Sequence, residues 1–203
     1  MNAARIEGGF VEIDAGTWLT SRGQPAAFFG GVRRRRRMGW CLRDRSRLDL
    51  LETSGVAKCS DSSRPFLLHI PCAAPVFTVS GKVLIAPVSA RKDARIVKLV
   101  PMSAKSAICV TEFVGDWVVM ATASRVCRIQ VAEGETLSVR PDAAVAWTGA
   151  MPTGFCPRLS VWDVFLPRQP RDLLLTFYGP SVVWIEGSRV PAMNLPGRWV
   201  YGV

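Results

Sequence analysis

Two stretches of this chain match each other without a gap when they are laid 118 positions apart. The first covers residues 11–31 (VEIDAGTWLTSRGQPAAFFGG) and the second covers residues 129–149 (IQVAEGETLSVRPDAAVAWTG). An internal repeat constrains the fold strongly, because both copies must build the same supersecondary unit. The apolar pairs predict equivalent core positions, and the glycine pairs predict turns with positive φ before equivalent strands. The matched pairs are Gly16/Gly134, Leu19/Leu137, Thr20/Ser138, Arg22/Arg140, Ala26/Ala144, Phe29/Trp147 and Gly31/Gly149.

A second match extends the repeat toward the C-terminus. Residues 66–70 (FLLHI) align with residues 173–177 (LLLTF), and without a gap Val76-Phe77 aligns with Val183-Trp184. In the later copy, Gly179-Pro180 separates two runs of β-favouring residues, which is typical of a strand, a turn and a second strand. Both matches occur in the same order, so they favour a duplicated β unit.

Short β-favouring runs separated by turn residues fill the rest of the chain. No window shows a sustained helical period, and prolines recur along the whole length. The 203 residues therefore predict one all-β sandwich or barrel, with repeat halves at about residues 10–88 and 115–187. Residues 32–47 are expected to form a basic loop, and residues 52–63 an exposed polar connection. Strands are expected at residues 10–19 (a pair), 66–70, 76–79, 83–88, 96–100, 108–113, 117–121 and 126–131, the last two forming a hairpin.

The repeated segments also resemble a known family. Residues 134–147 (GETLSVRPDAAVAW) and 173–185 (LLLTFYGPSVVWI) look like the C-terminal half of the AIM24 family, while residues 115–133 and 75–88 resemble its middle and first hairpins. The resemblance implies a fold similar to that of the tryptophan RNA-binding attenuation protein, of the double-stranded β-helix type. It also implies a non-enzymatic role in organising the mitochondrial inner membrane. The arginine-rich insert after Gly31 is not a family motif, and the glycine-rich loops usual in the family are poor here.

Residues that could support catalysis or metal binding are scattered along the sequence. His69 is the only histidine, and in an extended strand it lies on the opposite face from Cys72, so the two do not form a nucleophile and base. Acidic residues are not paired at a spacing typical of a metal site or a carboxylate dyad, and no glycine-rich phosphate loop occurs. The six cysteines lack a C-x-x-C motif and are expected to be reduced thiols. We therefore expect no enzyme, no metal, no cofactor and no small-molecule substrate.

The charge of the chain is concentrated in one segment. Residues 33–47 hold eight arginines and one aspartate, a net charge of +7 within a chain of net charge +10. Arginine outnumbers lysine by 21 to 5, and its planar guanidinium group binds phosphate in a bidentate manner and stacks on bases. A tryptophan within the segment offers a further stacking surface. The candidate polyanion-binding or RNA-binding residues are Arg33, Arg34, Arg35, Arg36, Arg37, Trp40, Arg43, Arg45 and Arg47.

Three partners remain open for this segment: RNA, an anionic membrane surface, and an acidic patch on another protein. No run approaches the roughly 18 apolar residues that a membrane helix needs, and the N-terminus lacks the apolar core of a secretory signal. The leading hypothesis is an RNA-contacting subunit or assembly factor of a ribonucleoprotein such as the mitochondrial ribosome, held against ribosomal RNA and neighbouring proteins. The alternative is a scaffold that organises the inner membrane without RNA. The expected location is mitochondrial, in the matrix or at the inner membrane, or cytoplasmic if the chain is bacterial.

Overall fold

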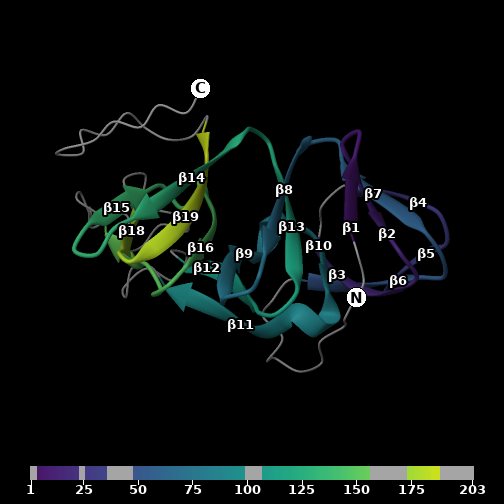
Figure 1. The fold of residues 1–203 in the computed structure, drawn as a ribbon, viewed down its shortest axis with the longest axis horizontal. Helices are drawn as coiled ribbons and strands as arrows, with labels where there is room; N and C mark the ends of the chain where they lie inside the picture. Colours follow the sequence, from purple (N-terminus) through teal and green to yellow (C-terminus); the bar gives the residue numbers. More distant parts are fainter. Residues whose placement is uncertain (1–3, 23–25, 36–47, 99–106, 156–172, 188–203) are drawn as a thin grey trace, which may run out of the picture. The chain divides into compact units, whose positions relative to one another are not determined.

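The computed structural model describes residues 4–22, 26–35, 48–98, 107–155 and 173–187 (Figure 1). Within these ranges the chain is built from antiparallel strands, and its helical segments are two short 3₁₀ turns, η1 (Ser80–Lys82) and η2 (Val88–Ala90). The predicted all-β class is confirmed. The chain divides into two compact units, one made of Met1–Ile96 and Cys109–Ala123 and the other of Val97–Ile108 and Ser124–Val203.

The first unit contains a four-stranded sheet in the order β1-β2-β7-β4 and a six-stranded sheet in the order β5-β6-β3-β10-β13-β8. Two further strands, β9 and β12, pair antiparallel with Val110 opposite Val79. The bounds of the strands are β1 (Ala4–Glu7), β2 (Phe10–Ile13), β3 (Gly16–Ser21), β4 (Ala26–Phe29), β5 (Val32–Arg35), β6 (Leu48–Thr53), β7 (Ala57–Asp61), β8 (Phe66–Pro71), β9 (Val76–Val79), β10 (Val83–Pro87), β11 (Arg91–Lys98), β12 (Ala107–Phe113) and β13 (Trp117–Thr122).

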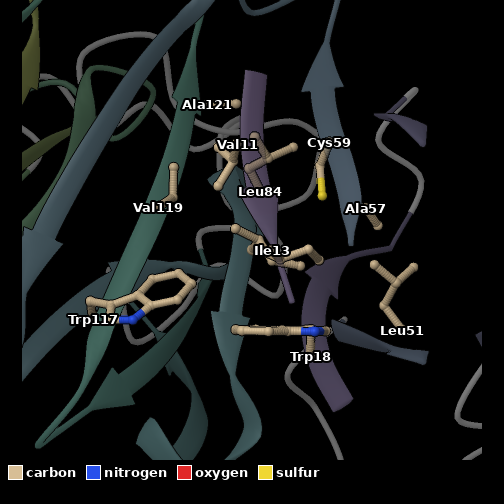
Figure 2. Close-up of a cluster of buried hydrophobic side chains, with 11 residues drawn as sticks. Val11, Ile13, Trp18, Leu51, Ala57, Cys59, Leu84, Trp117, Val119 and Ala121 are labelled. Atoms are coloured by element: carbon tan, nitrogen blue, oxygen red, sulfur yellow. The ribbon is translucent and has the colours of Figure 1, made fainter. Parts of the chain in front are cut away.

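Both sheets of the first unit contribute to one apolar core (Figure 2). Val11 and Ile13 of β2 are fully buried, because side chains that are two apart in a strand share a face. From the six-stranded sheet, the rings of Trp18 and Trp117 meet at a centroid distance of 5.7 Å. The indole Nε1 of Trp18 donates to Thr53 Oγ1 at 3.2 Å, so its polar atom is satisfied inside the core. Each large apolar side chain buried here stabilises the unit by about 1.5–3 kcal/mol.

The second unit is built from two three-stranded sets, β14-β19-β16 and β15-β18-β17. Its core includes Trp147 and Phe177, whose rings meet edge to face at 5.4 Å between centroids. A side chain at Gly179 would collide with the backbone carbonyl of Ala132, so only glycine fits between β18 and β19. The bounds are β14 (Val126–Val131), β15 (Thr136–Val139), β16 (Ala144–Thr148), β17 (Thr153–Phe155), β18 (Leu174–Tyr178) and β19 (Ser181–Glu186).

Six strands of each unit follow the same pairing scheme. In the first unit the sets are β2-β7-β4 and β3-β6-β5, and in the second unit they are β14-β19-β16 and β15-β18-β17. The internal repeat is therefore visible in the pairing of the strands. Residues 66–70, which the sequence match placed on residues 173–177, belong instead to β8, a strand that pairs with β13. That part of the alignment is wrong, because the counterpart of β18 is β6.

The repeat in β3 is displaced by one residue from the gapless alignment. Trp18 lies opposite Leu51, and both belong to the core of the first unit. The pair in the same place in the second unit is Leu137 opposite Phe177. Trp18, rather than Leu19, is thus the counterpart of Leu137; Leu19 is buried on the other face of β3.

The same displacement corrects the expectation for Phe29. Phe28 lies opposite Cys59 and packs against the core, while Phe29 is 58% exposed. The counterpart of the fully buried Trp147 is therefore Phe28. The extra residue of the second unit lies before Leu137, because Val11 opposite Cys59 still corresponds to Ile129 opposite Val183 at the original offset. One inserted residue moves every following side chain of the alignment to the opposite face.

Four local assignments from the sequence are also wrong. Val32–Arg35, expected within a basic loop, form β5, and Ala57–Asp61, expected in an exposed connection, form β7. The sequence AKCSD of β7 looks polar, but its alternate residues Ala57, Cys59 and Asp61 are buried. The expected hairpin of residues 117–121 with 126–131 does not form, because β13 pairs with β8 and β10 while β14 pairs with β19. Gly16 and Gly31 do not have the predicted positive φ, whereas their counterparts Gly134 and Gly149 do.

Candidate polyanion interface

Three of the predicted arginines lie on β5, one of the two edge strands of the sheet β5-β6-β3-β10-β13-β8. In the pairing with β6, Arg33 lies opposite Glu52, Arg34 opposite Leu51 and Arg35 opposite Leu50. All three residues are exposed. The other candidates, Arg36, Arg37, Trp40, Arg43, Arg45 and Arg47, lie outside the described residues.

Strand alternation divides these arginines between the two faces of the sheet. Val32 packs against the core, so the side chain of Arg34, two residues later, leaves the strand on this same core-facing side. Arg33 and Arg35 start from the outer face, where Arg35 Nε lies 3.2 Å from Glu52 Oε2. An ion pair this exposed adds little to stability, and solvent screens it. The outer arginines therefore remain accessible to an external anion.

Arg34 is held by an internal carboxylate. Its Nε and Nη2 atoms lie 3.1 Å and 3.0 Å from Oδ2 of Asp49, and Nη2 also donates to the carbonyl of Ser21 at 3.0 Å. On the other side of the carboxylate, Arg22 Nε lies 3.1 Å from Asp49 Oδ1. The side chain of Asp49 is 1% exposed, whereas those of Arg22 and Arg34 are 47% and 31% exposed. We refer to these three residues as the Asp49 cluster.

The sequence did not identify Asp49 and Arg22 as site residues. Asp49 lies within an apolar piece of sequence, Leu48-Asp49-Leu50-Leu51, and Arg22 stands out only as a repeat position. One signal was available: an acid two positions before Leu51 shares the buried face of that residue if the piece is a strand. A buried acid requires a charged or hydrogen-bonding partner, and arginines are the most abundant charged residues nearby in the sequence.

The earlier candidates for catalysis do not form a reactive pair. Burial raises the pKa of the Cys72 thiol to about 12, with a further contribution from nearby Asp116, so Cys72 stays protonated and is a poor nucleophile at neutral pH. His69 is exposed and its ring lies 5.8 Å from that of Trp117. Partial burial against neighbouring groups lowers the pKa of His69 below 6.5. The described residues contain no group of three or more histidine, cysteine or acidic side chains that could hold a metal ion. None of the helical segments among the described residues is long and apolar enough to span a membrane.

Comparisons with known proteins support the fold. No protein-family model matches the sequence, and a search of curated proteins gives no match. Among solved structures, the chain is similar to protein SPYM3_0169 from Streptococcus pyogenes, with a TM-score of 0.68 and 11% sequence identity. The superposition covers 92% of each chain. A likeness at this low identity shows that the two chains share an all-β fold.

Proposed function

We propose that this chain is a non-enzymatic binding module, held in a ribonucleoprotein assembly by RNA contacts from β5 and the arginine-rich sequence that follows it. The observation that carries the proposal is an outermost strand made almost entirely of exposed arginines, Val32–Arg35. It leads into a segment whose sequence contains five further arginines, Arg36, Arg37, Arg43, Arg45 and Arg47. The use of arginine indicates phosphate binding rather than a general contribution to solubility, because one planar guanidinium group can donate to two phosphate oxygens.

Binding of labelled RNA tests this proposal. The anisotropy of a fluorescein-labelled 20-nucleotide oligouridine is measured with the full chain over a range of salt concentrations. The test variant replaces Arg33, Arg35, Arg36 and Arg37 with serine and keeps Arg34, which holds the buried Asp49. We expect most of the affinity to be lost and the slope of log K against log salt to fall by about 0.7 for each lost phosphate contact on single-stranded RNA.

A charge-matched control separates a specific site from net charge. It replaces Arg5, Lys92, Arg125 and Arg128, which lie in other strands and turns and are exposed, with serine. This control loses the same four charges and should bind RNA almost as the wild type does. The same proteins are also tested on vesicles of phosphatidylcholine that contain the anionic lipid phosphatidylserine. Binding to these vesicles without binding to RNA would contradict the proposal and favour a membrane-organising scaffold.

A further inference from the structure

The repeat shows that the Asp49 cluster occupies a position that is apolar in the second unit. Because Trp18 opposite Leu51 corresponds to Leu137 opposite Phe177, the next pair on the same face also corresponds. That pair is Thr20 opposite Asp49 in the first unit, and Val139 opposite Leu175 in the second unit. All four side chains are buried. The first unit thus carries a polar pair where the same scheme accommodates an apolar one.

The fold itself does not explain a carboxylate at this position. Removing a carboxylate from water is unfavourable, and buried ion pairs seldom stabilise a fold more than apolar residues of similar size. The apolar pair Val139 and Leu175 shows that the pairing scheme is complete without a charge. Asp49 instead forms ion pairs with two arginines and so restricts their positions, while each arginine keeps part of its side chain in solvent.

The geometry of the two guanidinium groups suits an external anion. Each carboxylate oxygen of Asp49 accepts from a different arginine, Oδ1 from Arg22 and Oδ2 from Arg34. Arg34 contacts Asp49 and Ser21 through Nε and Nη2, and a guanidinium group has donors on all three nitrogens. A carboxylate that fixes these planes removes the rotamer freedom that a free arginine loses when it binds phosphate.

We propose that Asp49 is a positioning residue, which holds Arg22 and Arg34 as a preformed pair of guanidinium groups for the phosphodiester oxygens of RNA. This inference rests on the proposed function and deepens it, because it adds Arg22 to the interface and assigns Asp49 a role that is not contact with the RNA. Arg34 then has two roles, since it donates hydrogen bonds to the buried Asp49 on one side and to a phosphate oxygen in solvent on the other.

The inference predicts a change in RNA affinity opposite to the change that net charge alone predicts. Asp49→Asn removes a negative charge, so electrostatics alone predicts tighter RNA binding. Positioning predicts weaker binding, because both guanidinium groups lose the carboxylate that orients them. We expect the Kd for the labelled oligouridine to rise on the order of tenfold, the loss typical of one charge-assisted hydrogen bond. The salt slope should fall by about 0.7–1.4, equivalent to one or two phosphate contacts.

Glu52→Gln is the matched control, because Glu52 lies on the same strand, carries the same charge and faces the outer side. It should bind RNA as tightly as the wild type or more tightly. If Asp49→Asn and Glu52→Gln change the affinity in the same direction, the positioning role is wrong while the proposed function stands. If the wild type itself shows no salt-dependent binding to RNA, both are wrong.

A second variant and a direct readout guard against loss of folding. Asp49→Leu introduces the residue found at the equivalent position, Leu175, and should stay folded by circular dichroism while binding RNA as weakly as Asp49→Asn. In the wild type, the Nε–H resonances of Arg22 and Arg34 should shift when oligouridine is added, and a purely structural cluster would leave them unchanged. Unshifted resonances at saturating RNA would overturn the inference even if both variants unfold.

Discussion

Replacing Arg34 with serine should destabilise the first unit, whereas the same replacement of its neighbour Arg33 should not. The two residues carry the same charge and lie on the same strand, but they start from opposite faces. Arg34 bonds the buried Asp49 and the carbonyl of Ser21. Arg33 starts from the outer face, opposite the side chain of Glu52. The comparison therefore isolates the buried contact from the removal of charge.

The magnitude follows from the geometry of the Asp49 cluster. Removing one partner of a fully buried ion pair costs about 3–5 kcal/mol, because the other charge is left without compensation. Two features reduce this cost here: Arg22 still bonds Oδ1 of Asp49, and 31% of the Arg34 side chain is exposed to solvent. We expect Arg34→Ser to lower the free energy of unfolding by about 1–2 kcal/mol and Arg33→Ser by less than about 0.5 kcal/mol.

Urea unfolding followed by tryptophan fluorescence measures this difference, since Trp18 and Trp117 lie in the core of the same unit. With an m-value of about 2 kcal/mol/M, the midpoint for Arg34→Ser should fall by about 0.5–1 M. Adding Asp49→Leu to Arg34→Ser should restore much of the loss, because the uncompensated charge is then gone. Equal midpoints for Arg33→Ser and Arg34→Ser would refute the view that Arg34 supports a buried carboxylate.

Further predictions concern the register, two titratable groups and the native assembly. Phe28→Ala should cost about 1–2 kcal/mol in urea unfolding and Phe29→Ala less than about 0.5 kcal/mol, because Phe28 packs on the core and Phe29 is 58% exposed; the reverse order would contradict the one-residue displacement. The lowered pKa of His69 means that the folded state favours the neutral ring, so its contribution to stability is present above pH 6.5 and lost as the pH falls below it. His69→Gln should remove this part of the pH dependence of the urea midpoint. Cys59 and Cys72, whose thiol pKa values burial raises to about 12, should resist a thiol-specific reagent in the folded protein and react in urea. Ribosomal RNA and ribosomal proteins should co-purify with the native protein, and recovery as a free monomer would count against the proposed function.

The all-β class could be predicted because it depends on many weak signals that agree. Short β-favouring runs, frequent prolines and the absence of a helical period all indicate strands. The repeat was also detectable, since residues 11–31 and 129–149 both begin in strands of equivalent pairing, β2 and β14. Its details were not, because a gapless alignment cannot show the one extra residue that the second unit contains before Leu137. In a strand, an error of one residue exchanges the buried face for the exposed one.

The geometry of the candidate site could be predicted only in part, for a related reason. A run of arginines is visible in any sequence, and Arg33, Arg34 and Arg35 are indeed exposed. Their division between two faces depends on whether the segment is a strand, and β5 was expected to be a loop. Asp49 was still less visible, because its partner Arg22 is separated from it by 27 residues. Such a contact is created by the pairing of β3 with β6, which the sequence did not specify.

The repeat also indicates where the two units differ in chemistry. Equivalent pairs keep apolar residues at the centre of both cores, as with Trp18 and Leu51 in the first unit and Leu137 and Phe177 in the second. The difference begins one pair further along, where Thr20 and Asp49 replace apolar residues, and it continues into the arginines of β5. Because the scheme accommodates an apolar pair at this position, the strand pairing itself does not require a polar one. The proposed RNA contact at β5 would require one, since the phosphate oxygens would bind the same arginines that Asp49 is proposed to orient.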